Sequence, residues 1–302
     1  MAPSLQESEQ VSNELSIELK KSSKTKAFFS QLSKSWTGML GFSIVMILLL
    51  LSLFGQWITP YDPLYAELSK KLLPPLTDGH LLGTDQLGRD ILSRIIMGAR
   101  VSVIIGIATV LIAGLFGTIV GVIAGYFRGW IDVVLMRIVD VQLSFPFILM
   151  VLVINAVIGT GLRNIIISLA IGGWVIFARV IRSEVLAIRE KEFITACIAT
   201  GVSRFEILVK HIVPNLYTPI IVLASLQIGT YIIAEASVSF LGFGVQPPTP
   251  AWGNMLNEGK DYIFSSWWLI TFPGLAIVFT ALGVNLFGDW LRDTLDPGLK
   301  GE

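Results

Sequence analysis

Long apolar stretches, separated by shorter polar segments, run through the chain from about residue 36 onward. A helix must present about 20 apolar residues to cross a hydrocarbon core of about 30 Å. Stretches of that length and composition therefore predict transmembrane helices. Six windows qualify: Met39–Ile58, Val101–Tyr126, Val133–Ile158, Ile165–Ile181, Pro219–Leu241 and Trp268–Phe287.

The overall composition points to the same class of protein. Of 302 residues, 53% are hydrophobic and only 15% are charged, and the mean hydropathy is +0.73. A soluble fold cannot bury so much apolar surface, whereas a bilayer solvates it. The first apolar run is also longer than the apolar region of a signal peptide. We therefore expect an all-α integral membrane protein with six transmembrane helices, whose first span is not cleaved.

Basic residues are unevenly distributed, although the 22 lysines and arginines balance the 22 aspartates and glutamates. Short cytoplasmic segments of membrane proteins are enriched in lysine and arginine. Such residues gather in the N-terminal tail, after the second and fourth windows, and at the C-terminus (Lys20, Lys21, Lys24, Lys26, Lys34, Arg128, Arg182, Arg189, Lys191, Arg204, Lys210, Arg292 and Lys300). We predict that both termini are cytoplasmic, with a polar tail over residues 1–35 and a transmembrane domain over residues 36–302.

Two long connections between the windows fall on opposite sides of the membrane in this arrangement. The connection 59–98 holds four basic residues, but five acidic residues balance them. The alternation of the other segments requires this connection to be external. The connection 182–214 is then cytoplasmic.

The cytoplasmic connection is predicted to form a short helix, a stop and a second helix. Gly201 suits the left-handed residue that ends a helix, and Ser203 with Glu206 forms the S-x-x-E pattern that begins one. Pro214 predicts a kink near the membrane surface. The first helix is mildly apolar on one side, through Phe193, Ala196, Cys197 and Thr200. This side suits docking into a groove of a partner, and an ordinary hairpin between two spans is the alternative.

Glycines recur on one face of the second window. Gly117, Gly121 and Gly125 are spaced four residues apart, and Gly114 lies one turn earlier. Small residues on one helix face allow two backbones to approach closely in a membrane. This stripe predicts a tightly packed helix pair.

Four polar residues inside or near the windows are candidates for lining a pathway or gate. A carboxylate in a span should face the bundle interior or a water-filled cavity, so Glu235 either lines a polar pathway or bonds to a neighbouring helix. Asp140 has Arg137, one turn away, as its expected partner. For Asn155 and Asn285, a hydrogen bond between helices is the favoured interpretation and substrate binding is the alternative.

Signatures of enzymatic chemistry are missing from the sequence. It contains no G-x-x-x-x-G-K-[ST] phosphate loop, no H-E-x-x-H helix and no G-x-S-x-G elbow. His80 and His211 lie on opposite predicted sides, and Cys197 is the only cysteine, so neither a metal site nor a disulfide is indicated. We predict that the chain has no catalytic and no metal-binding residues.

The cytoplasmic connection resembles the EAA loop of ABC importer permeases. That pattern reads E-A-A, three residues, glycine, nine residues and I-x-L-P. Ala196 and Cys197 take the alanine places, Gly201 the glycine and Pro214 the final proline. The positions that depart from the pattern are Thr195, Cys197, His211 and Val213. The glycine and proline frame is intact.

Three further segments resemble the dipeptide, oligopeptide and nickel branch of these permeases. They cover residues 82–100, 235–253 and 288–297. With the EAA-like segment, the matches run from about Trp36 to the C-terminus. The resemblance implies the type I permease fold of ABC importers, with an EAA-type coupling helix.

The resemblance also implies roles for particular residues. An external binding protein would face Asp85, Arg89 and Asp90, and a solvated loop held by its own ion pairs is the alternative. The residues implied in coupling to the ATPases are Glu192, Phe193, Ala196, Cys197, Gly201, Ser203, Arg204 and Pro214.

The function implied by the resemblance is inward movement of di- or oligopeptides across the cytoplasmic membrane by alternating access. The expected partners are a sister permease, two ATPase subunits that bind ATP and magnesium, and an external binding protein, whereas the chain itself holds no cofactor. Nickel is the alternative substrate, although no histidine lies within a predicted span. An independent secondary transporter would show inverted repeats, and none is evident.

Overall fold

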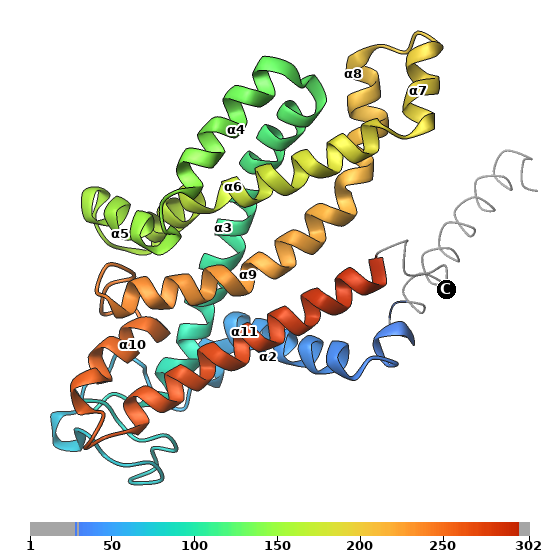
Figure 1. The fold of residues 1–302 in the computed structure, drawn as a ribbon. Helices are drawn as coiled ribbons and strands as arrows, with labels where there is room; N and C mark the ends of the chain where they lie inside the picture. Colours follow the sequence, from blue (N-terminus) through green and yellow to red (C-terminus); the bar gives the residue numbers. More distant parts are fainter. Residues whose placement is uncertain (1–27, 29, 296–302) are drawn as a thin grey trace, which may run out of the picture.

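The structure, a computed structural model, describes residue 28 and residues 30–295, which form a bundle of helices (Figure 1). Within this part of the chain, five helices are long and apolar enough to cross a membrane, and a bent pair of shorter helices supplies up to a sixth. The five are α2 (Trp36–Ile58), α3 (Ile91–Phe127), α6 (Leu162–Arg189), the continuous helix Arg204–Phe240 and α11 (Trp268–Leu295). The predicted helical membrane architecture is confirmed. Most of the predicted polar tail lies outside the described residues.

The remaining elements are shorter. The bent pair consists of α4 (Gly129–Leu143) and α5 (Phe147–Ile158). The continuous helix is divided into α8 (Arg204–Glu206), a π-helical turn η2 (Ile207–Ile212), a 3-10 turn η3 (Val213–Leu216) and α9 (Tyr217–Phe240). The others are η1 (Leu68–Lys70), α7 (Glu192–Ala199), α10 (Trp252–Gly259) and η4 (Lys260–Tyr262).

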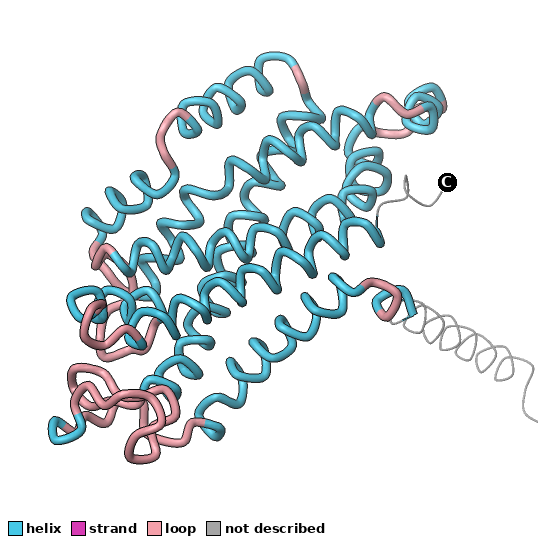
Figure 2. The backbone as a smooth tube through the Cα atoms, turned by 60° about the horizontal axis from the view of Figure 1, so that its bottom comes forward, coloured by secondary structure: helices cyan, strands magenta, loops and turns pink. Residues whose placement is uncertain are grey.

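The two ends of the bundle differ in what connects the helices. Long loops gather at one end, which we call the loop end, and include residues 59–90 and 241–251 (Figure 2). A backbone bond from the Gly161 amide to the Gly244 carbonyl, at 3.1 Å, joins two loops there. The opposite end carries the hairpin of α7 and α8, which projects beyond the spans (Figure 1). We call it the α7 end.

The glycine stripe forms the contact between α3 and α6. A Cβ added at Gly121 would lie 2.6 Å from the Ala178 carbonyl oxygen, and one at Gly125 would lie 2.8 Å from Val185 Cβ. Real Cβ atoms do not approach other atoms so closely, so a larger residue would push the helices apart. The close pair predicted from the sequence is therefore present, and α6 is its second member.

The third predicted window is not one helix. The chain turns by 87° between α4 and α5, and Pro146 lies at the N-terminal cap of α5. Proline disfavours helical backbone in the residue before it and has no N–H to donate, so an apolar run cannot continue as one helix through it. At 12 residues, α5 is about 18 Å long and too short to cross a bilayer alone.

The predicted external connection is also shorter than expected. Helix α3 begins at Ile91, with Asp90 as its N-cap: an Asp90 side-chain oxygen accepts from the Ser93 amide at 2.8 Å. At 37 residues, α3 is about 55 Å long and extends well beyond a hydrocarbon core of about 30 Å. The sequence predicts a loop up to Gly98 because polar residues interrupt the apolar pattern there. The helix nevertheless already begins at Ile91.

Candidate functional site

Gly201 ends α7 in the left-handed conformation that the sequence predicts. Its φ is +80°, and a Cβ added there would meet nothing within 4 Å. The Val202 amide donates to the Cys197 carbonyl at 3.1 Å, and the Gly201 amide donates to the Ile198 carbonyl at 3.1 Å. These two bonds form a Schellman motif, which satisfies the last carbonyls of a helix. Glycine is required for its backbone freedom alone, because the space beside it is open.

Ser203 begins the second helix of the hairpin. Its Oγ accepts from the Glu206 amide at 3.2 Å, as the S-x-x-E pattern predicts. The Glu206 carboxylate accepts from Lys210 Nζ at 2.7 Å and does not close the second half of the capping box. The Arg204 carbonyl accepts from the Tyr126 hydroxyl at 2.6 Å, which ties the restart of the chain to the end of α3.

An apolar cluster anchors the base of the hairpin. Ile194 of α7 is 1% exposed and packs against residues of α3, α6 and the continuous helix. The buried members of this cluster are Val122, Tyr126, Ile181, Val185, Ile188, Ile194, Ile207, Ile212 and Leu216. Pro214 lies between the last two of them, within η3. The kink predicted there takes the form of π and 3-10 turns, which change the hydrogen bonding without ending the helix.

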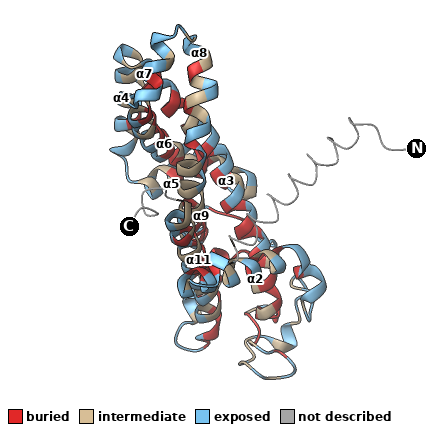
Figure 3. Ribbon diagram, turned by 90° about the vertical axis from the view of Figure 1, so that its right-hand side faces the viewer, coloured by how far each residue is buried: buried red, intermediate tan, exposed pale blue. Residues whose placement is uncertain are grey.

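The outer side of the hairpin remains uncovered in the single chain. Phe193 is 41% exposed, Ile198 is 59% exposed and Phe205 is 75% exposed, and pale exposed residues predominate in this region of Figure 3. Ala196 and Glu192 are exposed as well. A group of apolar side chains exposed at a polar end of a membrane protein is typical of a contact surface for another protein. Cys197 is only partly exposed.

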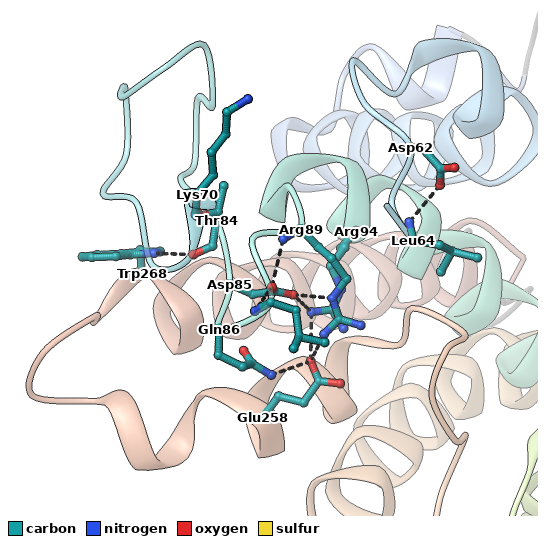
Figure 4. Close-up of polar contacts among 11 residues, drawn as sticks. Asp62, Leu64, Lys70, Thr84, Asp85, Gln86, Arg89, Arg94, Glu258 and Trp268 are labelled. Atoms are coloured by element: carbon teal, nitrogen blue, oxygen red, sulfur yellow. Dashed lines mark hydrogen bonds and ion pairs between the residues drawn. The ribbon is translucent and has the colours of Figure 1, made fainter. Parts of the chain in front are cut away.

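A buried ion-pair network occupies the loop end (Figure 4). Asp85 Oδ2 accepts from Arg89 Nε at 2.7 Å and also pairs with Arg94 of α3. Both arginines also contact Glu258 of α10, each at 2.8 Å. The side chains of Asp85, Arg89 and Arg94 are 2%, 7% and 3% exposed. The network therefore joins the loop 59–90, α3 and α10 in one buried cluster.

Asp90 belongs to a second buried contact. Besides capping α3, it accepts from His80 Nδ1 at 2.9 Å, and both residues are buried. Asp85, Arg89 and Asp90 thus point into the protein in this conformation. The expectation of a solvated loop is wrong, although its internal ion pairs are present. Asp85 and Arg89 are four positions apart, so the sequence indicates that they can pair. Glu258 lies 169 positions from Arg89, and no sequence pattern joins these two residues.

Two of the four gate candidates are buried. Glu235 is 1% exposed and accepts from Ser239 Oγ at 2.6 Å; that hydroxyl accepts in turn from the Val245 amide at 3.2 Å. The carboxylate is therefore tied to the loop after its own helix, and the expected bond to a neighbouring helix is not formed. Asn155 donates to Ser168 of α6, which is the bond between helices that the sequence predicts.

The other two candidates are exposed. Asp140 pairs with Arg179 of α6, not with Arg137, because α4 lies against α6 and brings Arg179 to it. Asn285 of α11 lies beside α9, where a Cβ added at Gly229 would be 2.9 Å from its Oδ1. The four candidates are distributed over four helices and do not form one site.

Comparison with known proteins reveals the family. The sequence profile described as "Binding-protein-dependent transport system inner membrane component" matches residues 117–301. A second profile, described as "N-terminal TM domain of oligopeptide transport permease C", matches residues 23–75. Together they reach both ends of the membrane-spanning part.

Curated relatives match over most of the chain. It is 42% identical over 272 residues to the dipeptide transport system permease protein DppC of Alkalihalophilus pseudofirmus, covering 90% of this chain and 89% of that protein. It is 38% identical to the probable D,D-dipeptide transport system permease protein DdpC of Escherichia coli, covering 86% and 87%. It is 41% identical to the glutathione transport system permease protein GsiD of Pectobacterium atrosepticum, covering 85% of each.

A solved structure shares the fold. A permease chain of the MetNI methionine ABC transporter, in an inward-facing conformation, matches with a TM-score of 0.58 at 18% identity, covering 68% of this chain and 98% of that chain. At this identity the match shows the fold alone. The chain belongs to the binding-protein-dependent transport system inner membrane components: it is a non-catalytic, multi-pass inner membrane permease of an ABC importer, in which ATP hydrolysis lies with partner ATPase subunits.

Proposed function

We propose that the chain imports di- or oligopeptides by alternating access, driven by ATPases that dock on the α7 hairpin. The observation that carries the mechanism is the hairpin itself. Its base is fixed by Ile194 and by the Tyr126 bond, its exit is fixed by Gly201, and its outer side exposes Phe193 and Ile198. A helix that is rigidly held and apolar outside can transmit the movement of a partner to the spans.

Peptides are the substrate class because the relatives compared above are named for dipeptides, a D,D-dipeptide and glutathione. The identities of about 40% extend over most of each chain and include both the loop end and the α7 end. The similarity is not confined to the segment that couples to the ATPases. A shared substrate class is the simplest explanation for similarity over the rest of the chain.

We place the α7 end in the cytoplasm, with both termini there. The support is the basic composition of this end, which includes Lys34, Arg189 and Arg292. The sister permease would pair through apolar surfaces of the spans, two ATPases would bind the two hairpins, and a binding protein would deliver substrate at the loop end.

Movement would pass from α7 to the spans through the apolar cluster at the hairpin base. Ile194 contacts residues of α3 and α6, and these two helices are held together by the glycine stripe. Displacement of α7 would therefore move α3 and α6 as one body. At the other end, the network around Asp85 would carry the external loop and α10 with α3.

The test is uptake by the complete importer in proteoliposomes, with its sister permease, ATPases and binding protein. We expect ATP-dependent accumulation of radiolabelled dialanine, and none with a non-hydrolysable ATP analogue. Accumulation of Ni²⁺ without any peptide, or of neither, would contradict the proposed substrate class.

A further inference from the structure

A cavity of about 710 Å³ opens between α6, α9 and α11 at the α7 end. Its lining is mixed. Apolar side chains come from α6 and α9, and polar groups come from Asn215 and Thr218. Charged side chains enter from three separate elements: Glu184 of α6, Lys191 before α7, and Arg292 near the end of α11. The gate candidates Glu235, Asp140, Asn155 and Asn285 do not line it.

The charges that line this cavity are not neutralised within the described chain. Ten ion pairs are formed among the described residues, and Glu184, Lys191 and Arg292 take part in none of them. Glu184 is partly buried, whereas Lys191 and Arg292 are exposed. Placing a carboxylate in such a position costs free energy unless a cation or hydrogen-bond donors approach it. A cavity with unpaired charges of both signs is therefore complementary to a ligand that also carries both signs.

We infer that this cavity binds the substrate during its passage, with Glu184 at the α-ammonium group and Arg292 and Lys191 at the α-carboxylate of a short zwitterionic peptide. The inference rests on the proposed function and names a site for it. The volume of the cavity is large enough for such a peptide, because small-molecule sites have volumes of about 300–1,000 Å³. The mixed apolar lining would accept different peptide side chains without selecting one.

The spacing of the charges fits such a ligand. Glu184 lies five positions before the end of α6 at Arg189, a rise of about 7.5 Å, and Lys191 lies two residues beyond that end. An extended peptide spans about 3.3–3.6 Å per residue, so its two ends are about 7 Å apart for two residues and about 10 Å for three. Opposite charges at such a distance also fix the direction in which the peptide lies.

The experiment measures equilibrium binding of peptides to the purified transporter in nanodiscs, without the binding protein. Three probes are used: radiolabelled dialanine, N-acetyl-dialanine, which lacks the ammonium group, and dialanine amide, which lacks the carboxylate. Glu184→Gln should weaken dialanine binding about tenfold and leave N-acetyl-dialanine unaffected, since the lost charge has no partner there. Arg292→Gln should weaken dialanine binding about tenfold and leave dialanine amide unaffected.

Two exposed residues outside the cavity provide matched controls. Asp289→Asn on α11 and Arg163→Gln on α6 remove the same charges and should bind all three probes as the wild type does. Lys191→Gln is not suitable, because Lys191 also precedes α7 as its N-cap. A structural defect would weaken all three probes together.

Equal weakening of every probe, unchanged binding in both variants, or absence of saturable binding to the wild type would each overturn the inference. The last result would point to a segment of the sister permease as the occupant. Uptake by the complete importer separates the two proposals: if dialanine is imported and the group-specific pattern is absent, only the cavity assignment fails. If no peptide is imported, the proposed function itself fails.

Discussion

Two groups of charged residues, one at each end of the permease, differ in how they are paired. At the loop end, Asp85, Arg89 and Arg94 are buried and paired with one another and with Glu258. At the α7 end, Glu184 and Arg292 line a cavity without an ion pair to any described residue. The first group is neutralised within the described chain, whereas the second is not.

This difference distinguishes residues that stabilise the chain from residues that are available to bind another molecule. Residues that are fully paired inside one chain gain little from a partner and serve mainly to hold three segments together. Residues left exposed or unpaired lower their free energy when another molecule binds. Asp85, Arg89 and Asp90, which the family resemblance assigns to a binding-protein contact, are buried, whereas Phe193 and Ile198 of the α7 hairpin are exposed.

The largest expected effect concerns which end faces the cytoplasm. In a Cys197→Ala background, Asp78→Cys at the loop end and Lys34→Cys at the α7 end provide single exposed thiols. In intact cells, a membrane-impermeant maleimide should label the first and not the second, and permeabilised cells should label both. Labelling in the opposite sense would reverse the orientation and remove the basis for ATPase docking at α7.

Breaking the loop-end network should cost the most stability. Asp85→Ala leaves two buried guanidinium groups with Glu258 as their only shared carboxylate, and loss of one partner from a buried ion pair costs about 3–5 kcal/mol. Denaturant titration of the purified permease in mixed micelles measures this change. Asp261→Asn, at an exposed position nearby, should change stability by less than about 0.5 kcal/mol. A loss below about 1 kcal/mol for Asp85→Ala would show that the network is not a structural tie.

The smallest effect is expected at Glu235. In Glu235→Gln, the side-chain oxygen still accepts from Ser239, so assembly and uptake should stay close to wild type. Ser239→Ala should cost more, about 1–3 kcal/mol, because it leaves the buried carboxylate and the Val245 amide without this partner. Denaturant titration measures the stability of both variants, and uptake and co-purification of the sister permease measure their function. Normal assembly with reduced uptake in Glu235→Gln would make this carboxylate part of the pathway.

Local signals predicted the ends and the packing faces of helices correctly. The Gly201 stop and the Ser203 start depend on residues within a few positions, and their hydrogen bonds are formed as expected. The glycine stripe at Gly117, Gly121 and Gly125 also predicts a packed face, because the periodicity of one helix determines which residues share it. Neither pattern indicates which helix will be the partner.

Contacts between distant segments could not be read in the same way. Arg179 replaces Arg137 as the partner of Asp140 because α4 and α6 pack together, which depends on the bend at Pro146. The proline was visible in the sequence, but a hydropathy window averages over it. Likewise, Glu184 and Arg292 are more than a hundred positions apart and only the packing of α6 with α9 and α11 brings them to one cavity.

The most direct test of the central claim, that α7 couples the permease to the ATPases, compares two substitutions at Gly201. Both add a Cβ where nothing lies within 4 Å, so steric contact does not distinguish them, whereas backbone preference does. Asparagine tolerates the left-handed conformation, whereas a β-branched valine is strained there by about 1–3 kcal/mol. The readout is peptide-stimulated ATP hydrolysis by the reconstituted importer, with co-purified ATPase as a second measure.

We expect Gly201→Asn to retain most of the stimulated hydrolysis. We expect Gly201→Val to insert and to pair with the sister permease, yet to lose bound ATPase or stimulated hydrolysis. Normal coupled uptake with fully bound ATPases in Gly201→Val would contradict the claim and reduce the hairpin to a connection between two spans.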